Sequence, residues 1–221
     1  MEERPLRRDA ERNRQLLLRT ALALMARDGL GVSYEKIAHE AGTGTGTVYR
    51  RFPERTDLVD ALFTEHVDAV VGLAERASRA EDAWEGLTWF LTRQFELEAD
   101  NRGLGELLRS GNQASHLVVR GRARITPLVA GLVDRAVSAG QLPAGVVPGD
   151  LVAVHLMVGA VMDAAREVDP TLWRRSLTVA LAGLRHAELP GTPPDEHVID
   201  RLYGVPPAQP DQEVVHRDTA E

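Results

Sequence analysis

The residues of this chain best suited to chemistry form a short polar set between two apolar helical stretches. Two hydroxyls, a phenol, a guanidinium and one position without a side chain make up the set: Thr45, Gly46, Thr47, Tyr49 and Arg50. Hydroxyls and a guanidinium can bond phosphate oxygens or base edges, and a threonine methyl can meet a thymine methyl. Gly46 would let the backbone approach a ligand closely. This surface suits the major groove of double-stranded DNA.

Two short helices must position these residues. Ser33 can cap the first helix, because its hydroxyl can accept from an otherwise unpaired backbone N–H. Gly42 ends that helix, since glycine takes the left-handed C-cap conformation without a steric penalty. The second helix runs from about Thr45 to Arg51, where the restriction on the residue before Pro53 closes it. Two short helices around a glycine turn predict a helix-turn-helix.

A glycine-rich loop that binds a nucleotide phosphate is the alternative for this segment. Its glycines, Gly42, Gly44 and Gly46, do not complete Gly-x-Gly-x-x-Gly, and a helix stands where that motif requires a strand. A P-loop would need Gly-Lys-Ser/Thr, which the sequence lacks. The spacing therefore favours DNA binding.

Longer helices flank the pair. Apolar residues at helical spacing predict a helix over about 10–28, stopped by Gly29, and another from 53–57 to about Arg79. Because Arg55 stands at the start of the latter helix, it could meet a phosphate with help from backbone N–H groups and the helix dipole.

The segment from Ala41 to Pro53, Ala-Gly-x-x-x-Gly-Thr-Val-Tyr-Arg-Arg-Phe-Pro, resembles the recognition segment of TetR-family transcriptional regulators. Arg14–Gly29 is similar to the first helix of that family, and Arg55–Phe63 to the start of its fourth. Many members carry a serine where Gly44 stands, which caps the recognition helix. Here Thr43 or a bare backbone must serve instead.

The resemblance implies an all-α protein. Its domains would be a three-helix helix-turn-helix DNA-binding domain at 10–70 and a helical ligand-sensing and dimerisation domain at 71–188. The Pro-rich tail at 189–221 has little to bury, and we expect it to be mobile. The expected DNA-binding residues are Ser33, Thr43, Thr45, Gly46, Thr47, Tyr49, Arg50 and Arg55.

The sequence beyond residue 82 reads as helical throughout. Its expected helices are Ala83–Asp100, Leu104–Ser110, Ser115–Ala139 with Pro127 as a bend, Asp150–Val168 and Thr171–Glu188. The last two helices are the most apolar, and small residues interrupt both. In the family the corresponding pair forms a four-helix bundle between two subunits, which suits a palindromic operator. Simple packing within one chain remains the alternative.

TetR-like proteins enclose a ligand pocket between these helices. The pocket candidates are Trp84, Trp89, Phe90, Phe95, His116, His155, Met157, Met162 and Asp163. We expect most of them to be core, because an aromatic or methionine on an apolar helix face more often serves packing than ligand contact. A basic run, Arg120, Arg122 and Arg124, is either a solvated helix face or a site for an anionic ligand.

Composition and charge bound the partners. The chain has 221 residues, no cysteine and a net charge of −7. Residues 1–55 hold eleven Lys/Arg and eight Asp/Glu, a balance of +3 that leaves −10 for the rest. No stretch approaches the 18 apolar residues of a membrane span, and no signal peptide is evident, so we expect a cytoplasmic protein without a membrane partner.

An enzyme is the rival class. No Gly-x-Ser-x-Gly, His-Glu-x-x-His or Walker sequence is present, and the seven histidines do not group at metal-ligand spacing. We therefore expect no catalytic, metal or cofactor site. A second rival is an architectural DNA binder that senses no ligand. The long helical region beyond the first third of the chain argues against it.

Overall fold

The computed structural model describes residues 3–109, 116–186 and 189–202, and within them all regular structure is helical, as the sequence predicts. The helices are α1 (Glu3–Asp28), α2 (Tyr34–Glu40), α3 (Thr45–Arg51), α4 (Arg55–Ala77), α5 (Ala83–Asp100), α6 (Arg102–Arg109), α7 (His116–Ser138), α8 (Pro148–Ala165), α9 (Leu172–His186) and α10 (Glu196–Leu202).

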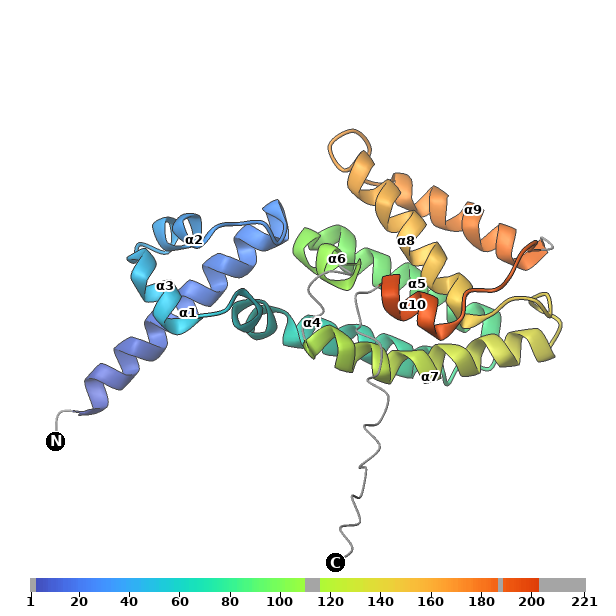
Figure 1. Cartoon of the computed structure of the whole chain (residues 1–221), viewed down its shortest axis with the longest axis horizontal. Helices are drawn as coiled ribbons and strands as arrows, with labels where there is room; N and C mark the ends of the chain where they lie inside the picture. The colour runs from blue at the N-terminus through green and yellow to red at the C-terminus, as the bar shows by residue number, and fades with distance from the viewer. Residues whose placement is uncertain (1–2, 110–115, 187–188, 203–221) are drawn as a thin grey trace, which may run out of the picture.

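The buried apolar side chains form two clusters, and α4 contributes to both. Its first half, from Leu58 to Val67, packs with α1, α2, α3, α6 and the start of α7. Its second half, from Val70 to Ala77, packs with α5, α7, α8 and α9. Figure 1 shows α1, α2 and α3 at one end of the molecule, with α4 leading from them to the C-terminal helices. We call α1 to α3 the head.

The ends of the head helices follow from local sequence. Gly29 and Gly42 take positive φ values of 84° and 63° directly after α1 and at the end of α2, where other residues would be strained. Helix α3 has the bounds that the sequence predicts. Helix α1 begins at Glu3, seven residues before the expected start.

Helix α8 differs in extent from expectation. Helix α8 begins at Pro148, and Asp150 accepts a hydrogen bond from the Val147 N–H at 2.8 Å, which closes its first turn. It ends at Ala165 rather than at residue 168. The expected ends Ser110, Ser115 and Glu188 lie outside the described residues.

Helix α8 corrects one further expectation. By length and composition alone, this 18-residue helix could cross a membrane. The prediction that no stretch approaches the length of a membrane span was therefore wrong. In this fold 39% of that helix is buried inside the molecule, where it packs against α9. A core helix of this kind passes the same length test.

The expected tail contains a helix that the sequence pattern does not predict. Helix α10 contacts α8 and buries Ile199, and Asp200 lies 3.6 Å from Arg122 of α7. With only Ile199 to bury, α10 has too weak an apolar pattern to be recognised in the sequence. The part of the tail from 203 to 221 lies outside the described residues.

Candidate functional site

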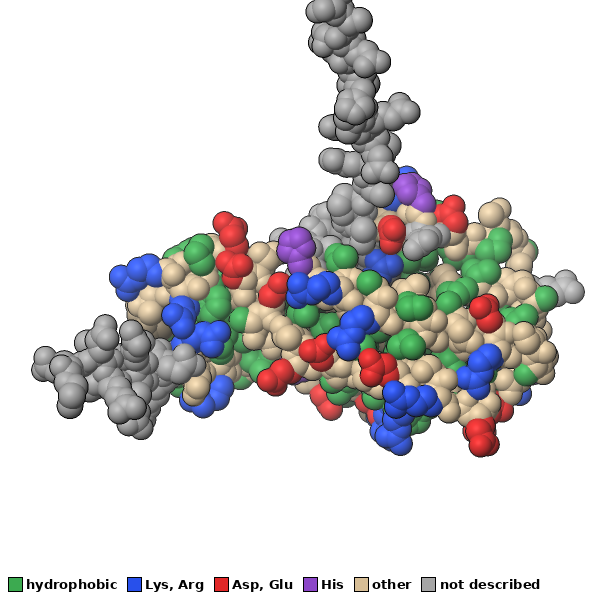
Figure 2. All heavy atoms as spheres, turned by 90° about the horizontal axis from the view of Figure 1, so that it is seen from below, with side chains coloured by type: hydrophobic (Ala, Val, Ile, Leu, Met, Phe, Trp, Pro, Cys, Tyr) green, Lys and Arg blue, Asp and Glu red, His purple; other side chains and the backbone are tan. Residues whose placement is uncertain are grey.

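The outer face of α3 carries the polar residues singled out in the sequence. Val48 is fully buried against the head core, whereas Gly46, Thr47, Tyr49 and Arg50 are exposed. One buried residue in a seven-residue helix leaves nearly the whole remaining surface to solvent. Figure 2 shows basic side chains gathered at this end of the molecule on the face drawn.

Glycine shapes the start of α3. Gly44 is the N-cap of α3, and because it has no side chain it makes no side-chain capping bond. Its backbone carbonyl accepts a hydrogen bond from the Thr47 N–H at 2.8 Å. The bare backbone therefore serves, and Thr43 does not. A methyl group added at Gly46 would meet nothing within 4 Å, so this position is open outward.

Tyr34 of α2 holds the end of α3 in place. Its hydroxyl donates toward the carbonyls of Phe52, at 3.0 Å, and Glu54, at 3.2 Å, and its ring meets the Tyr49 ring edge-on with centroids 4.8 Å apart. Burial raises the pKa of Tyr34, so the hydroxyl stays protonated and remains a donor. Tyr49 is still 51% exposed. Ser33 caps α2 by accepting from the Lys36 N–H at 3.2 Å.

Arg55 makes contacts within the protein that the sequence does not predict. Its guanidinium donates to the Leu30 carbonyl and lies over the Tyr34 ring, 5.4 Å from the centroid. Arg55 is half-buried, and this burial lowers the pKa of its guanidinium. In this structure Arg55 therefore tethers α4 to the loop after α1, and the expected phosphate contact stays a prediction.

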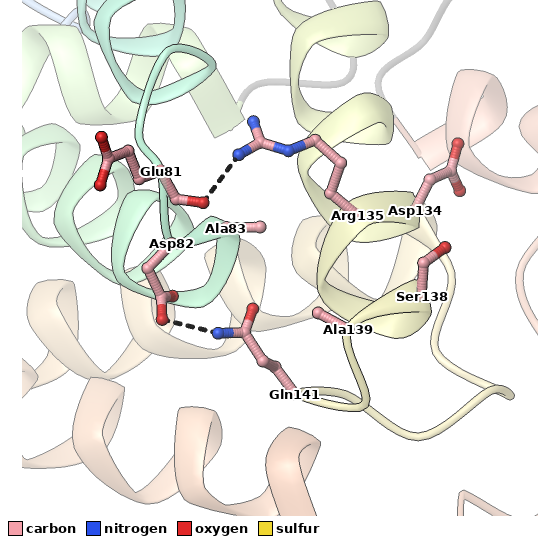
Figure 3. Close-up of a pocket in the computed structure, with 8 residues that line it drawn as sticks. All are labelled: Glu81, Asp82, Ala83, Asp134, Arg135, Ser138, Ala139 and Gln141. Atoms are coloured by element: carbon pink, nitrogen blue, oxygen red, sulfur yellow. Dashed lines mark hydrogen bonds between the residues drawn. The ribbon is translucent and has the colours of Figure 1, made fainter.

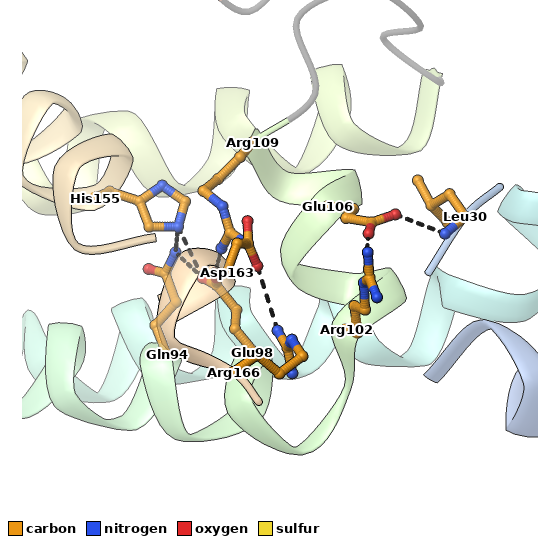
Figure 4. Close-up of polar contacts among 9 residues, drawn as sticks. All are labelled: Leu30, Gln94, Glu98, Arg102, Glu106, Arg109, His155, Asp163 and Arg166. Carbon is orange, nitrogen blue, oxygen red and sulfur yellow. Dashed lines mark hydrogen bonds and ion pairs between the residues drawn. The ribbon is translucent and has the colours of Figure 1, made fainter. Parts of the chain in front are cut away.

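Helix α6 binds the backbone N–H of the same residue, Leu30. The Leu30 N–H donates to Glu106 at 2.7 Å, and Arg102 fixes the second oxygen of that carboxylate at 2.8 Å. Gly103 lies so close to α1 that an added methyl would come within 2.8 Å of the Met25 carbonyl. Figure 4 shows the contact of Leu30 with Glu106 of α6. Together with the bond from Arg55 of α4, it holds the loop after α1 from two sides.

A buried polar cluster connects α5, α6 and α8 (Figure 4). Glu98 is fully buried; one of its oxygens pairs with Arg109, and the other lies 2.8 Å from His155 Nε2 and 3.1 Å from Gln94 Nε2. Arg109 also meets Asp163 at 2.9 Å. Gly159 gives that arginine its room, because an added methyl there would lie 2.3 Å from Arg109 Cδ.

A cavity of about 700 Å³ lies beside this cluster. Its walls come from α4, α5, α6, α7, the start of α8 and the segment 194–200. Most of the lining is apolar, and the polar side chains among it are Gln94, Arg122, Thr126, His155 and Asp200. This size and composition are typical of small-molecule sites.

Two of the expected pocket residues, Phe90 and His155, line the cavity. The others lie elsewhere. Phe95 and Met162 are buried in the core, Trp84 and Trp89 pack against its edge, His116 is exposed at the start of α7, Met157 is 57% exposed, and Asp163 pairs with Arg109 and Arg166.

The sequence reasoning missed Gln94, Glu98 and Arg109. A signal for two of them exists: Leu87, Leu91, Gln94 and Glu98 follow helical spacing, so two polar residues continue an apolar stripe. The basic run divides between its two alternatives. Arg122 lines the cavity, whereas Arg124 lies on the surface and pairs with Asp68 at 2.7 Å.

A second, polar groove lies between the start of α5 and the end of α7 (Figure 3). Arg135 donates to the carbonyls of Ser78 and Glu81, and Gln141 Nε2 donates to Asp82 at 2.6 Å. These bonds join α7 to the connection between α4 and α5. The groove is therefore a structural joint.

Helices α8 and α9 expose apolar side chains on their outer face. Met157 is 57% and Val179 is 64% exposed, and small residues, Ala160, Ala164, Ala182 and Gly183, are exposed around them. Isolated apolar residues on a surface are ordinary, but a face of two adjacent helices matches an interaction surface.

Known proteins match both parts of the chain. The family model of bacterial regulatory proteins of the tetR family matches residues 17–62, and the model of the C-terminal domain of SbtR-like transcriptional regulators matches residues 82–186. An HTH-type transcriptional regulator of Staphylococcus aureus strain USA300 is 28% identical over 109 residues, which cover 48% of this chain and 59% of the relative. The chain thus spans under two thirds of that relative.

Solved structures share the fold. The transcriptional regulator FadR from Bacillus subtilis, solved with stearoyl-CoA, aligns with a TM-score of 0.60 and 18% identity over 79% of this chain and 99% of that one. RolR, solved with resorcinol, aligns with a TM-score of 0.53 and 17% identity over 92% and 98%.

The structure is that of a helix-turn-helix protein, in which the head is joined through α4 to a helical domain that contains a cavity. With family models matching both domains, the chain belongs to the TetR family of bacterial transcriptional regulators.

Proposed function

We propose that the protein is a ligand-responsive repressor that binds a palindromic DNA operator as a homodimer and is released by a small molecule. The observation that carries the proposal is the outer face of α3, where Gly46, Thr47, Tyr49 and Arg50 are exposed above a single buried anchor, Val48. A helix of this shape can enter a major groove with its polar side chains toward base edges and phosphates.

The exposed apolar face of α8 and α9 supports the dimer. Close approach of two such faces would bury Met157 and Val179, and the small residues around them would let helices pack tightly. A twofold dimer presents two α3 helices related by the same symmetry as a palindrome. The place of action would be the cytoplasm, where the DNA is.

The cavity supports the ligand response. It is lined by Val67 and Val70 of α4, the helix that also carries the head, so its contents bear directly on α4. A ligand can shift the separation of two heads only by binding one arrangement of α4 more tightly than the other. The complexes of FadR with stearoyl-CoA and of RolR with resorcinol make a small-molecule effector plausible for this fold.

Selection of genomic fragments with purified protein at physiological salt, followed by footprinting, tests the proposal. A dyad-symmetric footprint on an enriched site is the expected result. Salt-sensitive binding without any enriched sequence would contradict it and favour an architectural binder. The position of the site relative to a promoter then distinguishes repression from activation.

A further inference from the structure

The cavity wall carries one polar group whose bonding is incomplete. Gln94 is 8% exposed and lines the cavity from α5, next to Glu98 and His155. Its amide nitrogen lies 3.1 Å from Glu98 Oε1 and 3.0 Å from His155 Nε2. The contact with the Glu98 carboxylate determines how the carboxamide is oriented.

The carboxylate of Glu98 decides which end of the amide faces it. A carboxylate paired with Arg109 only accepts hydrogen bonds, so the group 3.1 Å away must be the NH₂ of Gln94 and not its oxygen. By the same reasoning, His155 turns a protonated Nε2 toward Glu98, 2.8 Å away. The oxygen of Gln94 therefore points away from the cluster, as Figure 4 shows.

Among the residues that the structure describes, the Gln94 oxygen accepts no hydrogen bond. The oxygen is open to the cavity, so water or a bound molecule can reach it. Here the carbonyl belongs to a side chain on the wall of a cavity that can hold a small molecule. A bound molecule with a hydroxyl or N–H group would supply the missing donor.

Resting on the proposed ligand response, we propose that the effector is an apolar molecule with a hydroxyl or N–H donor, and that it donates a hydrogen bond to the Gln94 carboxamide oxygen. The apolar body would contact the wall that includes Phe90, Leu91 and Val129. An anionic group does not suit this end of the cavity, because the Gln94 oxygen would face it and the buried Glu98 carboxylate lies directly behind Gln94.

Arg122 identifies the competing ligand chemistry. It lines the cavity from α7 and lies 3.6 Å from Asp200, so a carboxylate ligand could take the place of Asp200. That pair is partly exposed, with 22% and 38% of the two side chains accessible, and Arg122 already has an acidic partner. The Gln94 oxygen has no donor, which favours the hydroxyl or N–H ligand.

Matched pairs of probes test the proposal on the full chain. The probes are 2-naphthol, 4-octylphenol and 1-dodecanol, each with its methyl ether, together with 2-naphthoate as the anionic probe. Calorimetric titration should show that the wild type binds at least one donor probe about 10-fold more tightly than its ether, the size expected for one hydrogen bond. The Gln94→Leu variant should bind each pair equally.

Thr126→Val is the matched control, because Thr126 is a polar wall residue outside the cluster. It should keep the preference for the donor. Equal binding of probe and ether by the wild type, tightest binding of 2-naphthoate, or binding of no probe at all would each overturn the proposal. Wild-type results alone can overturn it, even if Gln94→Leu does not fold.

Footprinting without any probe separates this proposal from the proposed function. Operator binding together with no donor preference means that the effector inference fails and the regulator remains. Absence of sequence-specific DNA binding means that the proposed function itself fails, whatever the probes do.

Discussion

The two polar regions of this molecule are built in opposite ways. On α3 the polar groups are exposed and make few contacts: Arg50 lies 3.5 Å from the Thr47 hydroxyl, and the Tyr49 ring meets Tyr34 edge-on. At the junction of α5, α6 and α8 they are buried and bonded to one another. Substitutions on α3 should therefore change DNA binding and spare stability, whereas substitutions in the buried cluster should change stability first.

The largest effect is expected from Arg109→Met. This change leaves the fully buried Glu98 carboxylate without its cationic partner, and breaking a buried pair in this way costs about 3–5 kcal/mol. Urea unfolding measures the loss. Arg124→Met is the control, since the exposed pair with Asp68 should contribute about 0–1 kcal/mol. Equal effects of the two variants would contradict the comparison.

Gly46→Ala should move binding and stability in opposite directions. The position is open in the free protein, so alanine should stabilise α3 by up to about 1 kcal/mol. The added methyl should keep the helix from close approach and weaken operator binding by about 10-fold, a change of ~1.4 kcal/mol. Fluorescence anisotropy and thermal unfolding measure the two quantities.

Gly131→Ala is the matched control for that change. It lies exposed within α7, and an added methyl there also meets nothing within 4 Å. It should give a similar gain in stability and no change in DNA affinity. Unchanged operator binding by Gly46→Ala would show that α3 does not approach DNA at this residue.

Arg55→Met tests the tether. Because Arg55 bonds the Leu30 carbonyl, its loss should loosen the head on α4 and weaken binding to all sequences alike, by about 3- to 10-fold for one hydrogen bond. If Arg55 contacted a phosphate, its loss would instead make the slope of log affinity against log salt concentration shallower by about 0.9. Arg50→Met, which removes an exposed cation of α3, should show that reduced slope. A reduced slope for Arg55→Met would instead support the phosphate contact predicted from the sequence.

The head could be predicted more fully than the cavity, and for a physical reason. The bounds of α3 depend on neighbours in the sequence, since Gly44 precedes it and Pro53 closes it. Glu98, Arg109 and His155 come from three helices, up to 57 positions apart, and only packing brings them together. The direction of Arg55 likewise depends on Leu30, a contact that spacing does not encode.

The smallest effect concerns the surface of the head. Hydrogen bonds from Arg27 and then Lys36 hold the pKa of Asp28 well below its usual range. A depressed pKa stabilises the fold above about pH 4 and loses that contribution as the pH falls through the folded-state value. Asp28→Asn should therefore be slightly less stable than the wild type at pH 7, with the gap closing below about pH 4. A gap that widens on acidification would contradict this assignment.

The most direct test of the account compares the DNA-sequence preferences of the wild type and of Thr47→Ala, each selected from a random library. If α3 reads base edges within a twofold dimer, Thr47→Ala changes the preference at one pair of positions related by the dyad and leaves the others intact. A uniform loss across all positions, or a change at a single unpaired position, would contradict the account.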